Sequence, residues 1–283
     1  MRIQQCSNDQ DADILALFGR RLMEIGDGNV DVLELEDDVV IGGDSFESFC
    51  DSIFPDFNTM YNDGDYLVSR AILTPVHTGV TYINNYLYNK FPCTEERVYL
   101  SVDSLPDNVD MDNYPVEVLN SLEFGNLPAH TLKLKIGCPV MLLRNLDPKS
   151  GLCNGTRLIC RAFGSSVIKV EITSGSHKGH MALIPRVKLS PTASTFPIPF
   201  LRKQFPITLS FASTINKAQG QTYSRVGIYL PSDVFSHGQL YVAMSRVGNP
   251  SALKFFFDKP LSPGETNYKT ANVVYKEVYN RLE

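Results

Sequence analysis

No stretch of the 283 residues approaches the run of about 20 apolar residues that a membrane-spanning helix requires. The first residues, MRIQQC, also lack the apolar core of a signal peptide. These two absences argue against both a membrane protein and a secreted one. With 43% hydrophobic and 20% charged residues, the sequence is typical of a globular protein with one large or two modest domains.

The six cysteines include no C-x-x-C pair, and six residues separate even Cys153 from Cys160. This spacing argues against a zinc ribbon. His177 and His180 are close enough in sequence to face one metal ion, but no third ligand accompanies them, and the Gly- and Ser-rich residues 174–180 favour a loop. The sequence therefore predicts no metal site, and we expect six reduced thiols of an intracellular protein.

The net charge of −5 is the sum of very unequal parts. Residues 1–66 carry a net charge of −13, residues 67–130 carry −5, and residues 131–283 carry +13. In the basic part, charged residues alternate with apolar ones, as in residues 132–136 (LKLKI), which indicates a folded surface. Such a surface attracts the phosphate backbone of a nucleic acid. The acidic residues 34–38 are interpreted as a solvated face.

Two helices are predicted near the beginning of the chain. Apolar residues recur at helical spacing over residues 11–26, and the Gly-Asp-Gly sequence at residues 26–28 is a helix stop signal. A second, short helix is expected to begin at the N-cap signal in residues 44–49 and to end at Pro55.

Further along, the pattern is that of strands followed by helices. Apolar runs predict strands at residues 66–73, 207–211 and 225–230, followed by predicted helices at residues 78–87, 214–220 and 238–245. Between them, residues 132–189 show short strands separated by turn residues, which is typical of a small antiparallel barrel. The sequence therefore predicts a parallel α/β domain that is interrupted by a small β insertion.

Three polar segments lie where predicted strands give way to helices, the positions at which α/β domains present ligand groups. They are residues 73–77 (LTPVH), 210–222 (SFASTINKAQGQT) and 238–247 (GQLYVAMSRV). The first segment also fits an ordinary turn, and the arginine of the third also fits a surface salt bridge. The second is the most informative, because its Lys217 and Gln221 have no obvious role in a core.

Together these segments resemble the late motifs of superfamily 1 helicases, in wording specific to the Pif (petite integration frequency) family. Residues 213–222 are similar to motif V and residues 241–246 (YVAMSR) to motif VI. Residues 142–147 (LLRNLD) and 151–158 (GLCNGTRL) resemble the start of the SH3-like insertion of that family. The resemblance extends from the first residue to about residue 257.

The resemblance implies the carboxy-terminal half of an ATP-dependent DNA helicase that unwinds DNA in the 5′-to-3′ direction. Its fold would be a RecA-like parallel sheet flanked by helices (domain 2A), with an inserted SH3-like β-barrel (domain 2B). We expect domain 2A at residues 1–130 and 204–283, and domain 2B at residues 131–203. The family also implies roles in DNA repair, recombination and telomere or replication maintenance, in the nucleus or the mitochondrion.

Family roles transfer to this sequence residue by residue. Arg246 matches the arginine finger of motif VI, which acts on the γ-phosphate of ATP. Arg2 resembles the arginine of motif IV in the same site. Gly220 and Gln221 match the part of motif V that lines the nucleotide cleft.

The same resemblance implies contacts with single-stranded DNA. Thr214, Asn216 and Lys217 lie where motif V holds the strand, and Thr74 and His77 are further DNA-contact candidates. Other relatives carry His at the position of Asn216, so no argument that needs an imidazole applies there.

The resemblance does not include the first motor domain (1A) of such helicases. ATP and Mg²⁺ bind such motors through a P-loop, G-x-x-x-x-G-K-[ST], and an acidic pair. The sequence has no P-loop; residues 151–156 read as a hairpin turn and residues 32–38 as a solvated connection. The resemblance thus implies a fragment that is inactive alone. A non-catalytic module that binds single-stranded DNA, or a remnant of a transposon-borne helicase, stays open as an alternative.

Overall fold

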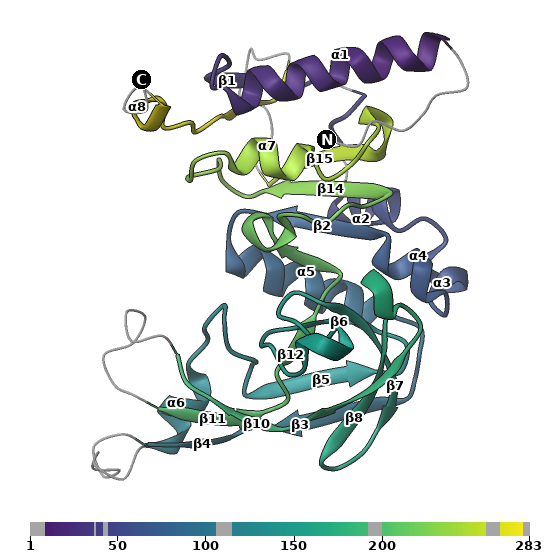
Figure 1. Cartoon of the computed structure of the whole chain (residues 1–283), viewed down its shortest axis with the longest axis vertical. Coiled ribbons are helices and arrows are strands. Elements are labelled where there is room, and N and C mark those ends of the chain that lie inside the picture. Colours follow the sequence, from purple (N-terminus) through teal and green to yellow (C-terminus); the bar gives the residue numbers. More distant parts are fainter. Residues whose placement is uncertain are drawn as a thin grey trace. The chain divides into compact units, whose positions relative to one another are not determined.

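The computed structural model describes residues 9–36, 38–41, 45–105, 115–191, 200–258 and 267–279 (Figure 1). The chain divides into two compact units. The α/β unit consists of Met1–Phe57, Ser69–Leu87 and Phe211–Glu283, and the β unit consists of Asn58–Val68 and Tyr88–Ser210. In the part of the chain that the structure describes, no helix has the length and apolar content needed to cross a membrane.

The α/β unit is built on a four-stranded parallel sheet (Figure 1). Its strand order is β13 (Ala212–Thr214), β2 (Arg70–Thr74), β14 (Arg225–Leu230) and β15 (Leu253–Phe257). The neighbours β2 and β13 are separated in sequence by the larger segment of the β unit, Tyr88–Ser210. The prediction of a parallel α/β domain that is interrupted by a β insertion is therefore confirmed.

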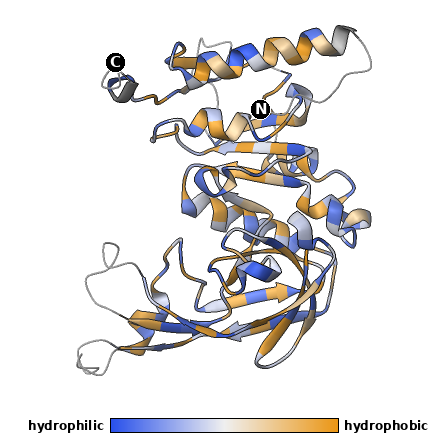
Figure 2. Ribbon diagram, in the orientation of Figure 1, coloured by the Kyte–Doolittle hydropathy of each residue, from blue (hydrophilic) through white to orange (hydrophobic). Residues whose placement is uncertain are grey.

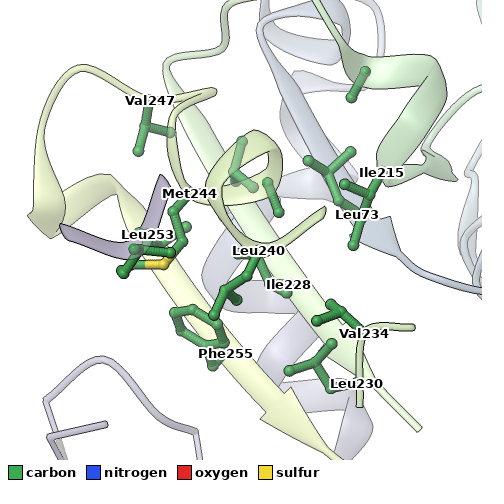
Figure 3. Packing of buried hydrophobic residues seen from close by; sticks show 14 of the residues in the cluster. Leu73, Ile215, Ile228, Leu230, Val234, Leu240, Met244, Val247, Leu253 and Phe255 are labelled. Carbon is green, nitrogen blue, oxygen red and sulfur yellow. The ribbon is translucent and has the colours of Figure 1, made fainter. Parts of the chain in front are cut away.

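Helices cover both faces of this sheet, because side chains of successive strand residues point to opposite faces. On one face, α7 (Gln239–Met244) packs on apolar residues of β2, β14 and β15 (Figure 3), and α1 (Asp9–Gly26) packs against α7. On the other face lies α2 (Phe46–Ile53), which packs so close to β14 that a Cβ at Gly227 would lie 2.6 Å from the Phe49 ring. The helix α5 (His77–Lys90) follows β2.

Local sequence explains the first two helices. Hydrophobic and hydrophilic residues alternate along α1 (Figure 2), and its apolar residues Phe18, Leu22 and Ile25 belong to the buried core. In α2, Ser45 is the N-cap, and its hydroxyl accepts the N–H of Ser48. Both helices were predicted from the sequence.

The remaining elements are short. They are β1 (Val32–Glu34), which pairs with β16 (Lys269–Ala271), the helices α3 (Phe57–Met60), α4 (Gly64–Val68), α6 (Val116–Ser121) and α8 (Lys276–Tyr279), and the 3-10 turns η2 (Pro148–Ser150), η3 (Gly175–His177), η4 (Ile215–Ala218) and η5 (Pro250–Ala252).

The described residues of the β unit form three antiparallel sheets. The largest has the order β12 (Ile207–Leu209), β6 (Pro139–Leu142), β7 (Arg157–Phe163), β8 (Val167–Ile172), β9 (Met181–Pro185). The others are β10 (Val187–Leu189), β11 (Leu201–Gln204), β4 (Val102–Ser104), and the pair β3 (Glu96–Leu100), β5 (Thr131–Lys135). The expected closed barrel is not observed, since the edge strands β12 and β9 do not pair with each other in the described residues.

Three predicted elements differ from the structure. Residues 66–68 belong to helix α4 rather than to a strand, because the Asp63 carboxylate accepts the N–H groups of Asp65 and Tyr66 and starts a helix. The strand predicted at residues 207–211 ends at Leu209: this strand, β12, joins the β unit, and the separate strand β13, which begins at Ala212, joins the parallel sheet.

The third difference concerns the helix predicted at residues 214–220. The structure has only the turn η4 there, and Gly220 follows it with a φ of 80°. That left-handed conformation is costly for other residues and does not continue a helix.

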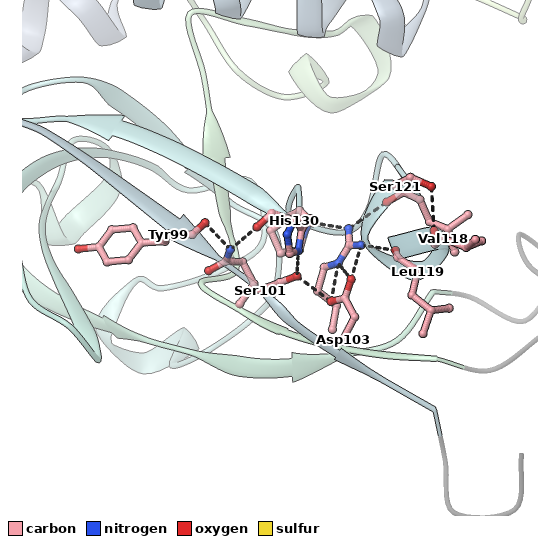
Figure 4. Close-up of polar contacts among 11 residues, drawn as sticks. Tyr99, Ser101, Asp103, Val118, Leu119, Ser121 and His130 are labelled. Carbon is pink, nitrogen blue, oxygen red and sulfur yellow. Dashed lines mark hydrogen bonds and ion pairs between the residues drawn. The ribbon is translucent and has the colours of Figure 1, made fainter. Parts of the chain in front are cut away.

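A buried ion pair holds part of the β unit together (Figure 4). Arg202 of β11 and Asp103 of β4 are fully buried, and the Arg202 Nη2 atom lies 2.7 Å from Asp103 Oδ2. The same guanidinium donates to the carbonyl oxygens of Leu119 and Leu122 at the end of α6. Ser101 Oγ donates to Asp103 Oδ1, so the carboxylate has further partners. The pair therefore joins two strands to the carboxyl end of a helix.

We predict that Arg202→Met lowers the free energy of unfolding by about 3–5 kcal/mol, because it leaves the Asp103 carboxylate buried without a cation. Urea unfolding followed by circular dichroism measures this loss. Arg161→Met is the matched control. Its partner Glu171 Oε2 lies 2.7 Å from Nη2, but the pair is partly exposed, so the loss should be about 1 kcal/mol or less. Similar losses of stability in Arg202→Met and Arg161→Met would contradict the stabilising role of the buried ion pair.

Candidate nucleic-acid and nucleotide site

Three loops leave the carboxyl edge of the parallel sheet from neighbouring positions. Thr214 at the end of β13 is paired with Thr74 at the end of β2, and β14 lies on the other side of β2. Parallel strands end at the same edge, where α/β domains bind ligands. The polar segments around Thr74 and Thr214 therefore meet, and the third segment follows the loop after β14.

The turn η4 presents polar side chains because its apolar ones are buried. Ile215 and Ala218 belong to the core, and Ile215 points inward in Figure 3. Asn216 between them is exposed, and Lys217 is half-buried. Burial lowers the pKa of the Lys217 amine. The turn thus offers an amide and an amine at the sheet edge.

The start of this segment is attached to helix α5 by one side chain. The Asn84 Oδ1 atom accepts the N–H of Ala212 at 2.9 Å, and Nδ2 donates to the Ala212 carbonyl at 3.3 Å. The amide side chain thereby forms the hydrogen bonds that a further strand would form with the edge strand β13. Sequence reasoning missed Asn84, whose partner is 128 positions away.

A second side chain attaches η4 to helix α7. Gln239, which is 2% exposed, donates from Nε2 to Asn216 Oδ1 at 3.4 Å. Its Oε1 accepts the N–H groups of Phe235 at 3.0 Å and Ser236 at 3.2 Å. Two donors face Oε1, so the hydrogen-bond pattern determines which way the amide points. Gln239 was not identified as a site residue from the sequence.

The segment after η4 is held by Gln221. Its Nε2 donates to the Lys217 carbonyl at 3.3 Å, and its Oε1 accepts the Tyr223 hydroxyl. Gly220 is exposed, and apart from its chain neighbours no atom of the described residues lies within 4 Å of the position that a Cβ would take. Its left-handed backbone, rather than crowding, thus favours glycine.

Arg246 connects the end of α7 to the same segment. Its Nε donates to the Val242 carbonyl at 2.8 Å, and Nη1 donates to the carbonyls of Gln221 at 2.9 Å and Ala218 at 3.3 Å. Nη2 contacts the Ser245 hydroxyl at 2.8 Å. Burial lowers the pKa of the guanidinium, although an arginine stays charged at neutral pH. This contact network differs from the surface salt bridge that the sequence left open.

Thr74 and His77 differ in accessibility. Thr74 is 0% exposed, and its side chain lies against α5, where a Cβ at Gly79 would be 2.8 Å from Oγ1. A direct contact between the Thr74 side chain and DNA would require it to leave this packing. His77 is exposed. Its pKa is lowered by partial burial of the ring and, to a smaller extent, by the charge of Lys217, and both effects favour the neutral imidazole.

Comparison with known proteins finds sequence and structural similarity to one family of DNA helicases. Residues 117–163 match the model of the DNA helicase Pif1 2B domain. The ATP-dependent DNA helicase Pif1 of Bdellovibrio bacteriovorus is 34% identical over 147 residues, or 51% of this chain and 31% of that protein. PIF1 of Homo sapiens is 32% identical over 155 residues, or 54% and 23%. The crystal structure of the Candida albicans Pif1 helicase covers 95% of this chain and 58% of its own, with a TM-score of 0.57 and 22% identity.

The chain is a relative of the Pif1 helicases. It spans less than a third of the length of the two Pif1 sequences above and a little over half of the Pif1 structure. The structural likeness shows a shared fold, and the sequence matches show the relationship.

The Pif1 motifs predicted from sequence fall into two groups. Arg246 contacts Gln221, so the two parts assigned to the nucleotide are together. Asn216, Lys217 and His77, assigned to DNA, share the carboxyl edge of the sheet.

Arg2 lies outside the described residues. Within those residues, no group of three or more His, Cys, Asp or Glu side chains is placed to hold a metal ion. The roles of all these residues in a Pif1-like reaction stay predictions.

We predict that Thr74→Val raises the free energy of unfolding by about 1 kcal/mol, because Thr74 Oγ1 is buried without a hydrogen-bond partner in the described residues. Thermal and urea unfolding test this. The control is Thr78→Val at an exposed neighbouring position, with an effect within about 0.5 kcal/mol. If Thr74→Val lowers the free energy of unfolding, the hydroxyl has a hydrogen-bond partner. The same conclusion follows if the variant lowers DNA affinity without changing stability.

Proposed function

We propose that this chain forms the second motor domain of an ATP-dependent DNA helicase of the Pif1 type. The parallel sheet is then the RecA-like domain 2A, at residues 1–130 and 204–283, and the SH3-like domain 2B is the insertion at residues 131–203. The compact β unit is larger than this insertion, because it also includes Asn58–Val68 and begins its second segment at Tyr88. The domain limits are therefore part of the proposal.

One observation carries the proposal. The segment between β13 and Tyr223 has Asn216 and Lys217 at one end and the contact with Arg246 at the other. A motor domain must couple the hydrolysis of a nucleotide to movement along a nucleic-acid strand. A short segment with strand-binding residues at one end and the arginine contact at the other supplies that coupling.

The nucleotide side consists of Arg246, Gly220 and Gln221. A guanidinium in a partly buried position acts strongly on charge that develops on a transferred phosphate. Nη2, which contacts the side chain of Ser245 rather than the backbone, is best placed to turn to a phosphate. Since the sequence has no P-loop, we assign the binding of ATP and Mg²⁺ mainly to a first motor domain (1A), and this chain alone is then inactive.

The strand side consists of Thr214, Asn216, Lys217 and His77. Amine, amide and hydroxyl groups hold a phosphate backbone without reading sequence. This agrees with a helicase that moves along DNA of any sequence. We further propose 5′-to-3′ unwinding and roles in repair, recombination and telomere or replication maintenance, in the nucleus or the mitochondrion, as the Pif1 relationship implies.

The arginine finger gives the first test. When this chain is joined to the first motor domain of a Pif1 relative, Arg246→Ala should lower the DNA-stimulated ATPase rate by roughly 10³-fold or more, because the finger stabilises charge in the transition state. Affinity for single-stranded DNA should change little. A coupled phosphate-release assay and fluorescence anisotropy measure the two quantities.

Arg225→Ala is the matched control for this variant. Arg225 is also half-buried in the α/β unit and donates to a backbone carbonyl, that of Ser52 at 2.8 Å, but it lies at the amino end of β14. Its ATPase rate should stay within a few-fold of the parent. A parallel loss of ATPase and DNA binding in Arg246→Ala would contradict the finger role, as would magnesium-dependent ATPase of the isolated chain.

The strand side gives the second test. The isolated chain should bind single-stranded DNA at low salt, with affinity that falls as salt rises, because phosphate contacts release counterions. Lys217→Ala should reduce the slope of log affinity against log salt by about 0.7 for one lost phosphate contact. Lys254→Ala on β15, at the opposite edge of the sheet, should leave the slope unchanged. The absence of binding at low salt would disprove the strand site.

A further inference from the structure

The loop between β14 and α7 exposes an aromatic ring at the carboxyl edge of the sheet. Val234 is buried beside Leu230 in the core, as Figure 3 shows, whereas the next residue, Phe235, is 60% exposed. The loop is therefore anchored in the core at one position and presents a large apolar side chain to solvent at the next.

The position of Phe235 is determined by the buried amide of Gln239. The Oε1 atom of Gln239 accepts the Phe235 N–H, while its Nε2 donates to Asn216. One side chain thus ties the backbone of the aromatic residue to a residue of η4. An amide that is 2% exposed and has partners on both sides holds the two loops at a fixed spacing.

The ring and the polar residues of η4 lie at the same edge. Strands β13 and β14 lie on either side of β2 in the parallel sheet, so the loops that follow them leave the same edge of the sheet. Two residues after Phe235, the His237 ring stacks on Tyr275 with centroids 5.5 Å apart, and Tyr275 is 49% exposed. Aromatic rings beside an amine and an amide match the chemistry of a strand that has both bases and phosphates.

We propose that Phe235 stacks on a base of single-stranded DNA whose backbone is held at Asn216 and Lys217, and that Gln239 is a positioning residue for this contact. The proposal rests on the proposed function, since it adds base stacking to the same strand site. Stacking is tolerant of sequence, because every base has an aromatic face.

The test compares two fluorescent probes of about 12 nucleotides, oligo-dT and an abasic phosphodiester of equal length, with the full chain. The chain should prefer oligo-dT. Phe235→Ala should weaken oligo-dT binding about tenfold and leave both the abasic affinity and the salt slope unchanged. Phe235→Trp should restore the preference. Gln239→Leu should reduce the preference for oligo-dT even though the ring is intact.

Leu17→Ala is the matched control, since Leu17 is a comparably exposed apolar residue on α1. It should change neither affinity, and circular dichroism checks the fold of every variant. If the parent chain binds neither probe at low salt, the proposed function fails. If it binds both probes equally, or if Phe235→Ala weakens both alike, the stacking proposal fails while the strand site stands.

Discussion

The parallel pairing of β2 with β13 is the contact on which the candidate site depends. It places Thr214 beside Thr74, although the larger segment of the β unit lies between them in sequence. The short strand β13 lies at the edge of the sheet, and the amide of Asn84 forms hydrogen bonds to the backbone of Ala212 there. An edge strand without such partners has unpaired backbone groups. The backbone of β13, from which η4 leaves the sheet, is therefore held by β2 and by the Asn84 side chain.

Helix α7 holds the segment after β13 at two points. Gln239 at its start contacts Asn216, and Arg246 after its end contacts Ala218 and Gln221. A helix of six residues is about 9 Å long, so the two contacts are spaced by a rigid element. In the proposed helicase, a movement of Arg246 on the nucleotide side would thus reach the strand side through α7 as well as through the backbone of η4.

In the β unit, a buried ion pair holds elements together. The sheet of β10, β11 and β4 is joined to α6 by the buried pair of Arg202 and Asp103, in which each charge has several hydrogen bonds. A buried pair contributes little over apolar packing when it is complete and costs much when one partner is lost. It therefore selects one arrangement of β4, β11 and α6. The sequence showed only an acidic and a basic residue 99 positions apart.

The sequence by itself determined the elements whose signals are local. The apolar spacing of α1, the cap at Ser45 and the apolar run of β14 each lie within a few residues, as do the polar groups around Lys217 and Arg246. Only the tertiary structure decided what depends on distant partners: the placement of β12 and β13 in two different sheets, the packing of Thr74 and the contacts of Asn84 and Gln239. The reason is physical, since local preferences amount to tenths of a kcal/mol and burial and hydrogen bonding between distant residues exceed them.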